Sequence, residues 1–221
     1  MNATNSRFGV DSLNYCEKVS ITTMVGFFAT ATSVAFIWPQ VVRVFVKNST
    51  EGISPLSFLQ GCCGSTMWTI YGISKPEGQV ALSNGLLVVA LSLILFVCVK
   101  HEKISWSVPV VTLIVVFIIG SLIANYSITL MGWCTVAIGA PAIIPQVVRV
   151  YQTEHLYGVS AAMYGLLSFC CLTWFIYGAM IDDWFVSLPN VVGTLGAFYI
   201  WIRAVKSHKK FIAPDELVPK L

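Results

Sequence analysis

The stretch Pro39-Gln-Val-Val-Arg-Val44 returns unchanged at Pro145–Val150. The offset of 106 positions then holds without a gap as far as Asn84 and Asn190, and 15 of the 46 aligned residues are identical. Each copy also contains a Gly-x-Ser and, further on, a Trp-x-Ile-Tyr-Gly. An internal repeat of this length predicts two structurally equivalent units. Polar and aromatic residues present in both units are therefore the first functional candidates.

The composition excludes a soluble globular domain. Of the 221 residues, 57% are hydrophobic and only 10% are charged, whereas soluble domains carry about 25% charged residues. A net charge of +3 gives no indication of nucleic-acid binding. The sequence contains no nucleophile–base pair, no phosphate-binding loop and no zinc-like spacing among its seven cysteines. We therefore expect neither an enzyme nor a metal or other cofactor.

Apolar runs long enough to cross a membrane occupy most of the chain. A spanning helix needs about 20 apolar residues. Seven such stretches are predicted, which makes the fold class an all-α integral membrane protein. They lie at roughly 19–43, 55–74, 79–99, 107–126, 129–151, 160–180 and 184–203.

The repeat groups these spans as three, then one, then three. The predicted units are an N-terminal tail (1–18), a first three-helix repeat (19–99), a linker helix (100–128), a second repeat (129–203) and a C-terminal tail (204–221). Three spans reverse the chain direction, so the single middle span restores it. The two triplets are therefore parallel repeats, and a substrate site is expected near the membrane midplane between them.

The distribution of basic residues predicts the orientation. If the N-terminus is outside, ten of the 13 Lys and Arg residues lie on the inner side and three on the outer side. Positive charge concentrates on the cytoplasmic side of membrane proteins. We expect an outside N-terminus, a cytoplasmic C-terminus and a location in the plasma membrane.

The repeated motifs resemble those of the PQ-loop superfamily. In each triplet a Pro-Gln at the inner end of the first span is followed by Gly-x-Ser, by Trp-x-x-Tyr-Gly and by an Asn sixteen residues after the Trp. Within the superfamily, residues 19–206 most resemble the SWEET and SemiSWEET sugar transporters. The resemblance implies the 3+1+3 fold and a sugar as the substrate class.

Four residues are predicted to bind the substrate: Asn84, Asn190, Trp68 and Trp174. An amide inside an apolar span must find a hydrogen-bond partner, and the two asparagines could bond sugar hydroxyls. The alternative is a structural hydrogen bond between helices. Tryptophan offers a flat face to the C–H side of a sugar ring, and its position matches the pocket of the resembling family. The alternative is packing, or anchoring at the membrane interface.

Two gates are expected on either side of that site. Proline inside a helix removes a hydrogen bond and kinks the helix, so Pro39 and Pro145, each followed by Gln40 or Gln146, are candidates for an inner gate or hinge. A static bend is the alternative.

The resemblance implies an outer gate made by a Tyr with a basic and an acidic residue four and six positions later. Tyr71, Lys75 and Glu77 fit this pattern, whereas Tyr177 and Asp183 fit it with Ile181 at the basic position. A cross-pair of Lys75 with Asp183 would form an outer latch.

The predicted function is bidirectional, uncoupled facilitated diffusion of a mono- or disaccharide by alternating access. No Asp, Glu, Lys or His lies near the middle of a predicted span, whereas proton-coupled carriers generally need such a residue. The expected partners are a small neutral solute and membrane lipid; homo-oligomerisation stays open. A proton-coupled amino-acid or metabolite exporter of the cystinosin type, and a non-transporting receptor of the same fold, are the alternatives.

Overall fold

The computed structural model describes residues 4–50, 53–156 and 159–210, and every regular element in these ranges is a helix. The predicted all-α fold is thus confirmed. The tail after Lys210 lies outside the described residues, as do Gly52 and Gly158 of the repeat. The elements are α1 (Thr4–Lys47), α2 (Pro55–Ser74), α3 (Gly78–Lys100), α4 (Ser107–Tyr126), α5 (Ile128–Gly139), the short 3-10 helix η1 (Ala140–Ile143), α6 (Ile144–Gln152), α7 (Ala161–Met180) and α8 (Trp184–Lys210).

Six helical segments in the described residues are long and apolar enough to cross a membrane, with α5, η1 and α6 together forming one of them. The predicted second span, α2, is not among the six, although its 20 residues match α4 and α7 in length. Helix α2 packs against α3, α4 and α5. Because neighbouring helices surround it, α2 can carry small and polar residues where a lipid-facing helix needs apolar ones.

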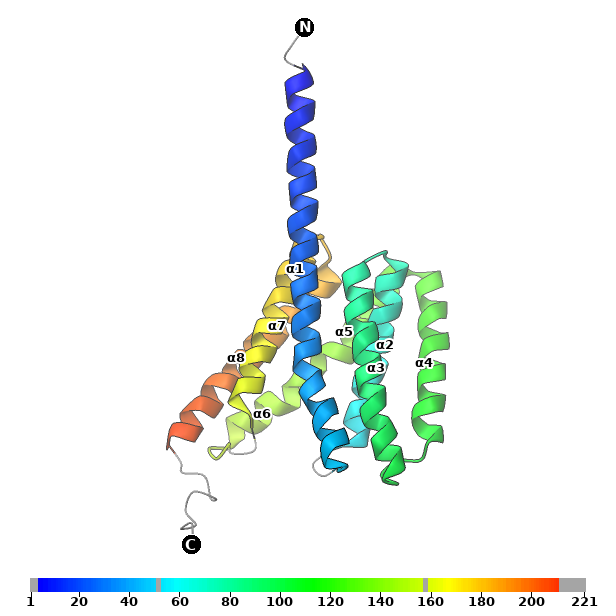
Figure 1. Ribbon diagram of the computed structural model, residues 1–221, viewed down its shortest axis with the longest axis vertical. Coiled ribbons are helices and arrows are strands. Elements are labelled where there is room, and N and C mark those ends of the chain that lie inside the picture. Colours follow the sequence, from blue (N-terminus) through cyan, green and yellow to red (C-terminus); the bar gives the residue numbers. More distant parts are fainter. Residues whose placement is uncertain (1–3, 51–52, 157–158, 211–221) are drawn as a thin grey trace.

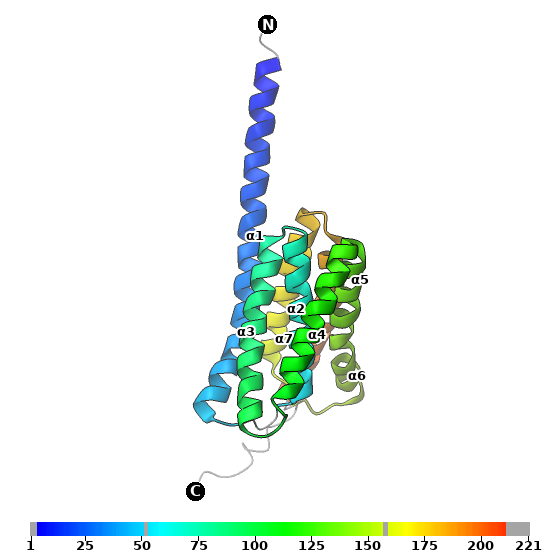
Figure 2. The same ribbon diagram turned by 90° about the vertical axis from the view of Figure 1, so that its right-hand side faces the viewer.

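The two halves have the same internal arrangement (Figures 1 and 2). In the first half α3 packs against both α1 and α2, and in the second α8 packs against α7 and against the α5–α6 segment. Between the halves, α1 packs on α7 and α2 packs on α5, which are repeat-related contacts. In Figure 1, α1, α3, α5–α6 and α8 run downward and α2, α4 and α7 run upward, so equivalent helices are parallel. The linker α4 lies outside, against α2 and α5.

Two helices extend into the segments predicted as tails. Helix α1 begins at Thr4, so most of the segment 1–18 is helical, and Figure 1 shows it projecting beyond the other helices. Helix α8 continues to Lys210, beyond the predicted boundary at residue 203.

The fifth span is broken, whereas its counterpart α1 is continuous. Gly139 ends α5, a 3-10 turn follows, and α6 carries Pro145 in its first turn. Proline lacks an N–H and clashes with the carbonyl four residues earlier. Pro141 and Pro145 interrupt two successive turns, whereas α1 contains only Pro39 and has Ala35 where the second half has Pro141. The two prolines therefore lie in different backbone settings, Pro39 inside a continuous helix and Pro145 at the start of one, and their role as hinges stays a prediction.

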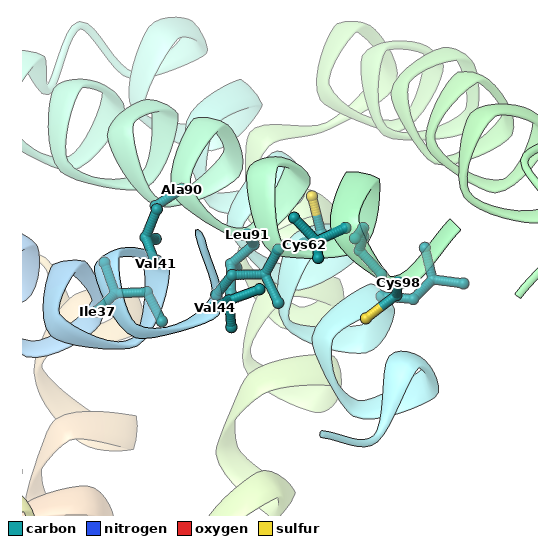
Figure 3. Close-up of a cluster of buried hydrophobic side chains, with 11 residues drawn as sticks. Ile37, Val41, Val44, Cys62, Ala90, Leu91 and Cys98 are labelled. Atoms are coloured by element: carbon teal, nitrogen blue, oxygen red, sulfur yellow. The ribbon is translucent and has the colours of Figure 1, made fainter. Parts of the chain in front are cut away.

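The first half has its own apolar core at the end opposite the α2–α3 turn (Figure 3). Ile37, Val41 and Val44 of α1 meet Ala90 and neighbouring residues of α3, with Cys62 of α2 and Cys98 of α3 completing the cluster. A second cluster joins the halves through Met67, Tyr71, Met131, Trp174 and Tyr177. This packing places aromatic residues of both repeats at the junction.

Glycines lie where α2 approaches α3 and where α7 approaches α8, near the connecting turns at the upper end of Figure 1. A Cβ on Gly72 would lie 2.5 Å from the backbone nitrogen of Ala81, and a Cβ on Gly178 would lie 2.8 Å from that of Ser187. These two contacts are 106 positions apart and thus equivalent in the repeat. A Cβ on Gly85 of α3 would meet nothing within 4 Å.

We therefore expect Gly72→Ala and Gly178→Ala to destabilise the protein, because backbone atoms must move to admit the methyl group, at a cost of about 1–3 kcal/mol. Gly85→Ala is the matched control and should leave stability unchanged or raise it, because alanine favours helix by about 1 kcal/mol. Thermal unfolding of the purified variants in detergent measures the effect. Equal melting temperatures for Gly72→Ala and Gly85→Ala would contradict this account of the packing.

Candidate substrate cavity and latch

A cavity of about 380 Å³ lies between the two halves. All four residues predicted to bind the substrate, Asn84, Asn190, Trp68 and Trp174, line it. They come from α3, α8, α2 and α7, which are the second and third helices of the two repeats. The fold thus brings residues 106 positions apart to one shared space, while their role as ligands stays a prediction.

The two asparagines have the same local geometry. Asn84 Nδ2 donates to the carbonyl oxygen of Val80 at 3.0 Å, and Asn190 Nδ2 donates to that of Val186 at 2.7 Å. Each bond uses one amide hydrogen and orients the side chain along its own helix. Since an amide has two N–H donors and an accepting oxygen, each asparagine keeps an acceptor and a second donor for a molecule in the cavity. Each of these two bonds lies within a single helix, so neither is the hydrogen bond between helices given above as the alternative.

The two tryptophans differ in their surroundings. Trp174 is 8% exposed, and its indole Nε1 donates to Ser33 Oγ of α1 at 2.9 Å. Trp68 is less buried and packs edge-on against Tyr71, with ring centroids 5.5 Å apart. Trp174 and Tyr177 repeat that aromatic contact at 5.6 Å. Each tryptophan therefore supports the tyrosine one turn further along its helix.

The cavity wall is neutral. No Asp, Glu, Lys, Arg or His is among the described residues that line it. The polar groups facing it come from amide, hydroxyl, indole and thiol side chains. A charged ligand would find no counter-ion among these residues, so their chemistry favours an uncharged molecule.

A polar cluster lies beyond the two cavity tryptophans, which pack against its tyrosines. We call this cluster the latch and define it as Tyr71, Lys75, Glu77, Tyr177 and Asp183. Tyr71 Oη donates to Asp183 Oδ2 at 2.8 Å, and Lys75 Nζ lies 2.7 Å from the same oxygen. Tyr177 Oη donates to Glu77 Oε2 at 3.2 Å. Each tyrosine thus bonds the acidic residue of the other half, and the cross-pair expected for Lys75 is present.

Asp183 also begins the last helix. Its other carboxylate oxygen, Oδ1, accepts from the backbone nitrogens of Phe185 and Val186 at 3.0 and 3.3 Å. Short acidic side chains are favoured at this position because they satisfy the free N–H groups of the first helical turn. With four donors the carboxylate tolerates burial at 1% exposure. Glu77, its counterpart, makes no such cap to α3.

The inner-gate candidates are separated by the fold. Gln146 of α6 lines the cavity, whereas Pro39, Gln40 and Pro145 are not among its described lining residues. Helix α1 packs on α3 and α7, and α6 packs on α8. The two Pro-Gln motifs therefore occupy equivalent places in sequence and different places relative to the cavity.

Sequence reasoning missed several lining residues, among them Ser33, Ser83, Tyr164 and Cys171. None of them is identical in the other repeat, where Gly139, Pro189, Phe58 and Ser65 stand. A search for identical pairs passes over such positions. A comparison of mismatched pairs near the conserved ones would have found Ser33.

The latch should be weakened more by Tyr71→Phe than by Tyr177→Phe. The first change removes a bond to a buried carboxylate and the second a longer bond to a more exposed one. A hydrogen bond to a charged group contributes about 1.5–3 kcal/mol, so the ratio of open to closed molecules should rise about tenfold in Tyr71→Phe.

In a protein without other reactive cysteines, spin labels can be placed at the exposed residues Ser74 and Asp182. Double electron–electron resonance then measures the distance between the α2–α3 turn and the α7–α8 turn. Tyr71→Phe should add a population of molecules at a longer distance, and Tyr177→Phe should add a smaller population at that distance. A distribution unchanged in both variants would show that these bonds do not hold the end closed.

In comparisons with known proteins, two different family models match the two repeats. Residues 21–79 match the family model described as PQ loop repeat, and residues 127–210 match the one described as Sugar efflux transporter for intercellular exchange. The chain is 19% identical to the bidirectional sugar transporter SWEET13 of Oryza sativa subsp. japonica over 70% of its length, and 25% identical to SWEET14 of Arabidopsis thaliana over 80%. It covers 57% and 70% of these relatives, so it spans less than two thirds of the rice protein.

A solved structure has the same fold. The 3.7 Å structure of a eukaryotic SWEET transporter superimposes with a TM-score of 0.69, at 15% identity, over 86% of this chain and 99% of that one. The two family models match different parts of the chain, and together with the parallel three-helix repeats and the linker helix they make the chain similar to SWEET transporters in sequence and in fold.

Proposed function

We propose that this protein carries sugars across a membrane by uncoupled, bidirectional facilitated diffusion. The observation that supports this most strongly is the neutral cavity between the halves, lined by two equivalent asparagines and two equivalent tryptophans. The relatives named above are bidirectional sugar transporters, which agrees with this proposal. A carrier of this kind needs no cofactor and catalyses no reaction.

The size of the cavity favours a small solute. Small-molecule sites measure about 300–1,000 Å³, and a cavity of about 380 Å³ is near the lower limit. The acceptor oxygens of Asn84 and Asn190 can each take a hydroxyl hydrogen, and the tryptophan rings can cover the apolar face of a pyranose. A monosaccharide fits this wall best, and a disaccharide would need the cavity to widen.

Transport by this cavity requires alternating access. The burial of the latch, with Tyr71 and Asp183 each 1% exposed and Tyr177 4% exposed, supports a state closed at this end. Opening would separate the two halves at the bonds Tyr71–Asp183 and Tyr177–Glu77, while the inner end closes. Gln146, at the cavity wall near the break in the fifth span, is the inner residue best placed to take part in that closure.

We further propose that the latch end faces outside, with the C-terminus in the cytoplasm of a cell whose plasma membrane holds the protein. The basic end of α8, which carries Lys206, Lys209 and Lys210, supports this orientation. The outward side chains of α4, including Val111, Ile114 and Phe117, are exposed and apolar, which suits contact with lipid.

Flux in proteoliposomes tests the function. Wild-type protein should move radiolabelled glucose in both directions at a rate indifferent to an imposed pH gradient. Asn84→Ala and Asn190→Ala should each lower the flux at least about tenfold, since each leaves solute hydroxyls without partners. Asn125→Ala, at the exposed end of α4, is the matched control and should transport normally.

Cystine and lysine, assayed alongside, test the alternative of a proton-coupled exporter. Amino-acid flux that follows the pH gradient and is abolished by Asp183→Asn would overturn the sugar-carrier proposal. Saturable sugar binding without flux in either direction would favour a receptor.

A further inference from the structure

The two tryptophans of the cavity are equivalent in sequence but not in hydrogen bonding. The indole N–H of Trp174 is engaged by Ser33 Oγ at 2.9 Å. Within the described part of the chain the indole N–H of Trp68 has no acceptor, although Trp68 also lines the cavity. Tryptophan has a single donor and no acceptor, so this difference decides what each indole can offer to a solute.

The cause is a mismatch in the repeat. Ser33 of α1 is 106 positions before Gly139 of α5, so the two occupy equivalent places beside Trp174 and Trp68. A Cβ added to Gly139 would lie 3.5 Å from Trp68 Nε1, in ordinary van der Waals contact. The glycine therefore stands where the other half has its hydroxyl acceptor, and it leaves room for one.

A second mismatch points the same way. Ser33 Oγ donates its hydrogen to the carbonyl oxygen of Ala29 at 3.0 Å and lies 3.4 Å from Cys170 Sγ. The residue equivalent to Cys170 is Gly64. The α1–α7 contact thus holds a small polar cluster around Trp174, whereas the equivalent α2–α5 contact has two glycines beside Trp68.

We propose that Trp68 is the hydrogen-bonding tryptophan of the site, donating its indole N–H to a hydroxyl oxygen of the bound sugar, while Trp174 offers only its ring. This inference rests on the proposed function and adds to it the orientation in which the sugar binds. Ser33 and Gly139 are positioning residues that decide which indole is free. The sugar lies nearer the α2–α5 side of the cavity and binds in one preferred orientation, despite the twofold repeat.

The state of the two indoles can be measured without any sugar. In protein labelled with ¹⁵N-tryptophan, Trp68→Phe and Trp174→Phe assign the two indole signals, and Trp106→Phe serves as a control outside the cavity. The Trp174 N–H should exchange slowly with solvent deuterium and the Trp68 N–H quickly. In Gly139→Ser the Trp68 N–H should become slow, because the new hydroxyl can accept it. Fast exchange at both positions, or slower exchange at Trp68, would overturn the proposal.

Transport kinetics test the bond to the solute. Trp68→Phe keeps an aromatic ring and removes the N–H, so the KM for glucose should rise about two- to tenfold, the effect of one hydrogen bond. Gly139→Ser should raise KM by a similar factor in the wild-type background and have no further effect in Trp68→Phe. Gly139→Ala adds the carbon without the acceptor, so its effect on KM should be smaller than that of Gly139→Ser.

The results separate the two proposals. Absence of glucose flux in the wild-type protein would overturn the proposed function on which the bond depends. Normal wild-type flux with an unchanged KM in Trp68→Phe, or with equal effects of Gly139→Ala and Gly139→Ser, would overturn the role of Trp68 alone.

Discussion

Polar side chains inside this bundle must find hydrogen-bond partners, because the hydrocarbon of a membrane provides none. Asp183 meets this requirement with four donors, two from its own helix and two from the other half. The asparagines of the cavity each use one amide hydrogen on the preceding helical turn. Asn84 and Asn190 line the cavity, and there a solute can supply partners for the amide oxygen and the second amide hydrogen of each.

The two repeats share one arrangement of helices but differ in several side chains and in the backbone of their first span. Lys75 adds an ion pair to Asp183 beside the hydrogen bond from Tyr71, whereas Ile181 provides no cation beside the bond between Tyr177 and Glu77. Pro141 breaks the fifth span where α1 is continuous. A solute without twofold symmetry is held better by such a site, since the halves can present different groups to its two sides.

Much of this arrangement could be predicted from the repeat. Offset identities singled out Asn84 and Asn190, and the outer-gate pattern that the resemblance implies indicated the pair of Lys75 with Asp183. The break at residues 140–143 was not predicted, because Pro145 aligns with Pro39 and the additional Pro141 has no counterpart in the first repeat. The helix cap by Asp183 depends on local geometry. The bond from Trp174 to Ser33 depends on a position where the two repeats differ, Ser33 in one and Gly139 in the other. Identity between repeats carries no information on either.

The central claim is that both halves build one shared solute site. Binding of radiolabelled glucose to purified protein, measured to saturation by equilibrium dialysis, tests this claim through its stoichiometry. The account predicts one glucose per chain, lost when either Asn84 or Asn190 is replaced by alanine, although the two residues are 106 positions apart. Two glucose molecules per chain, with one surviving each single replacement, would contradict it.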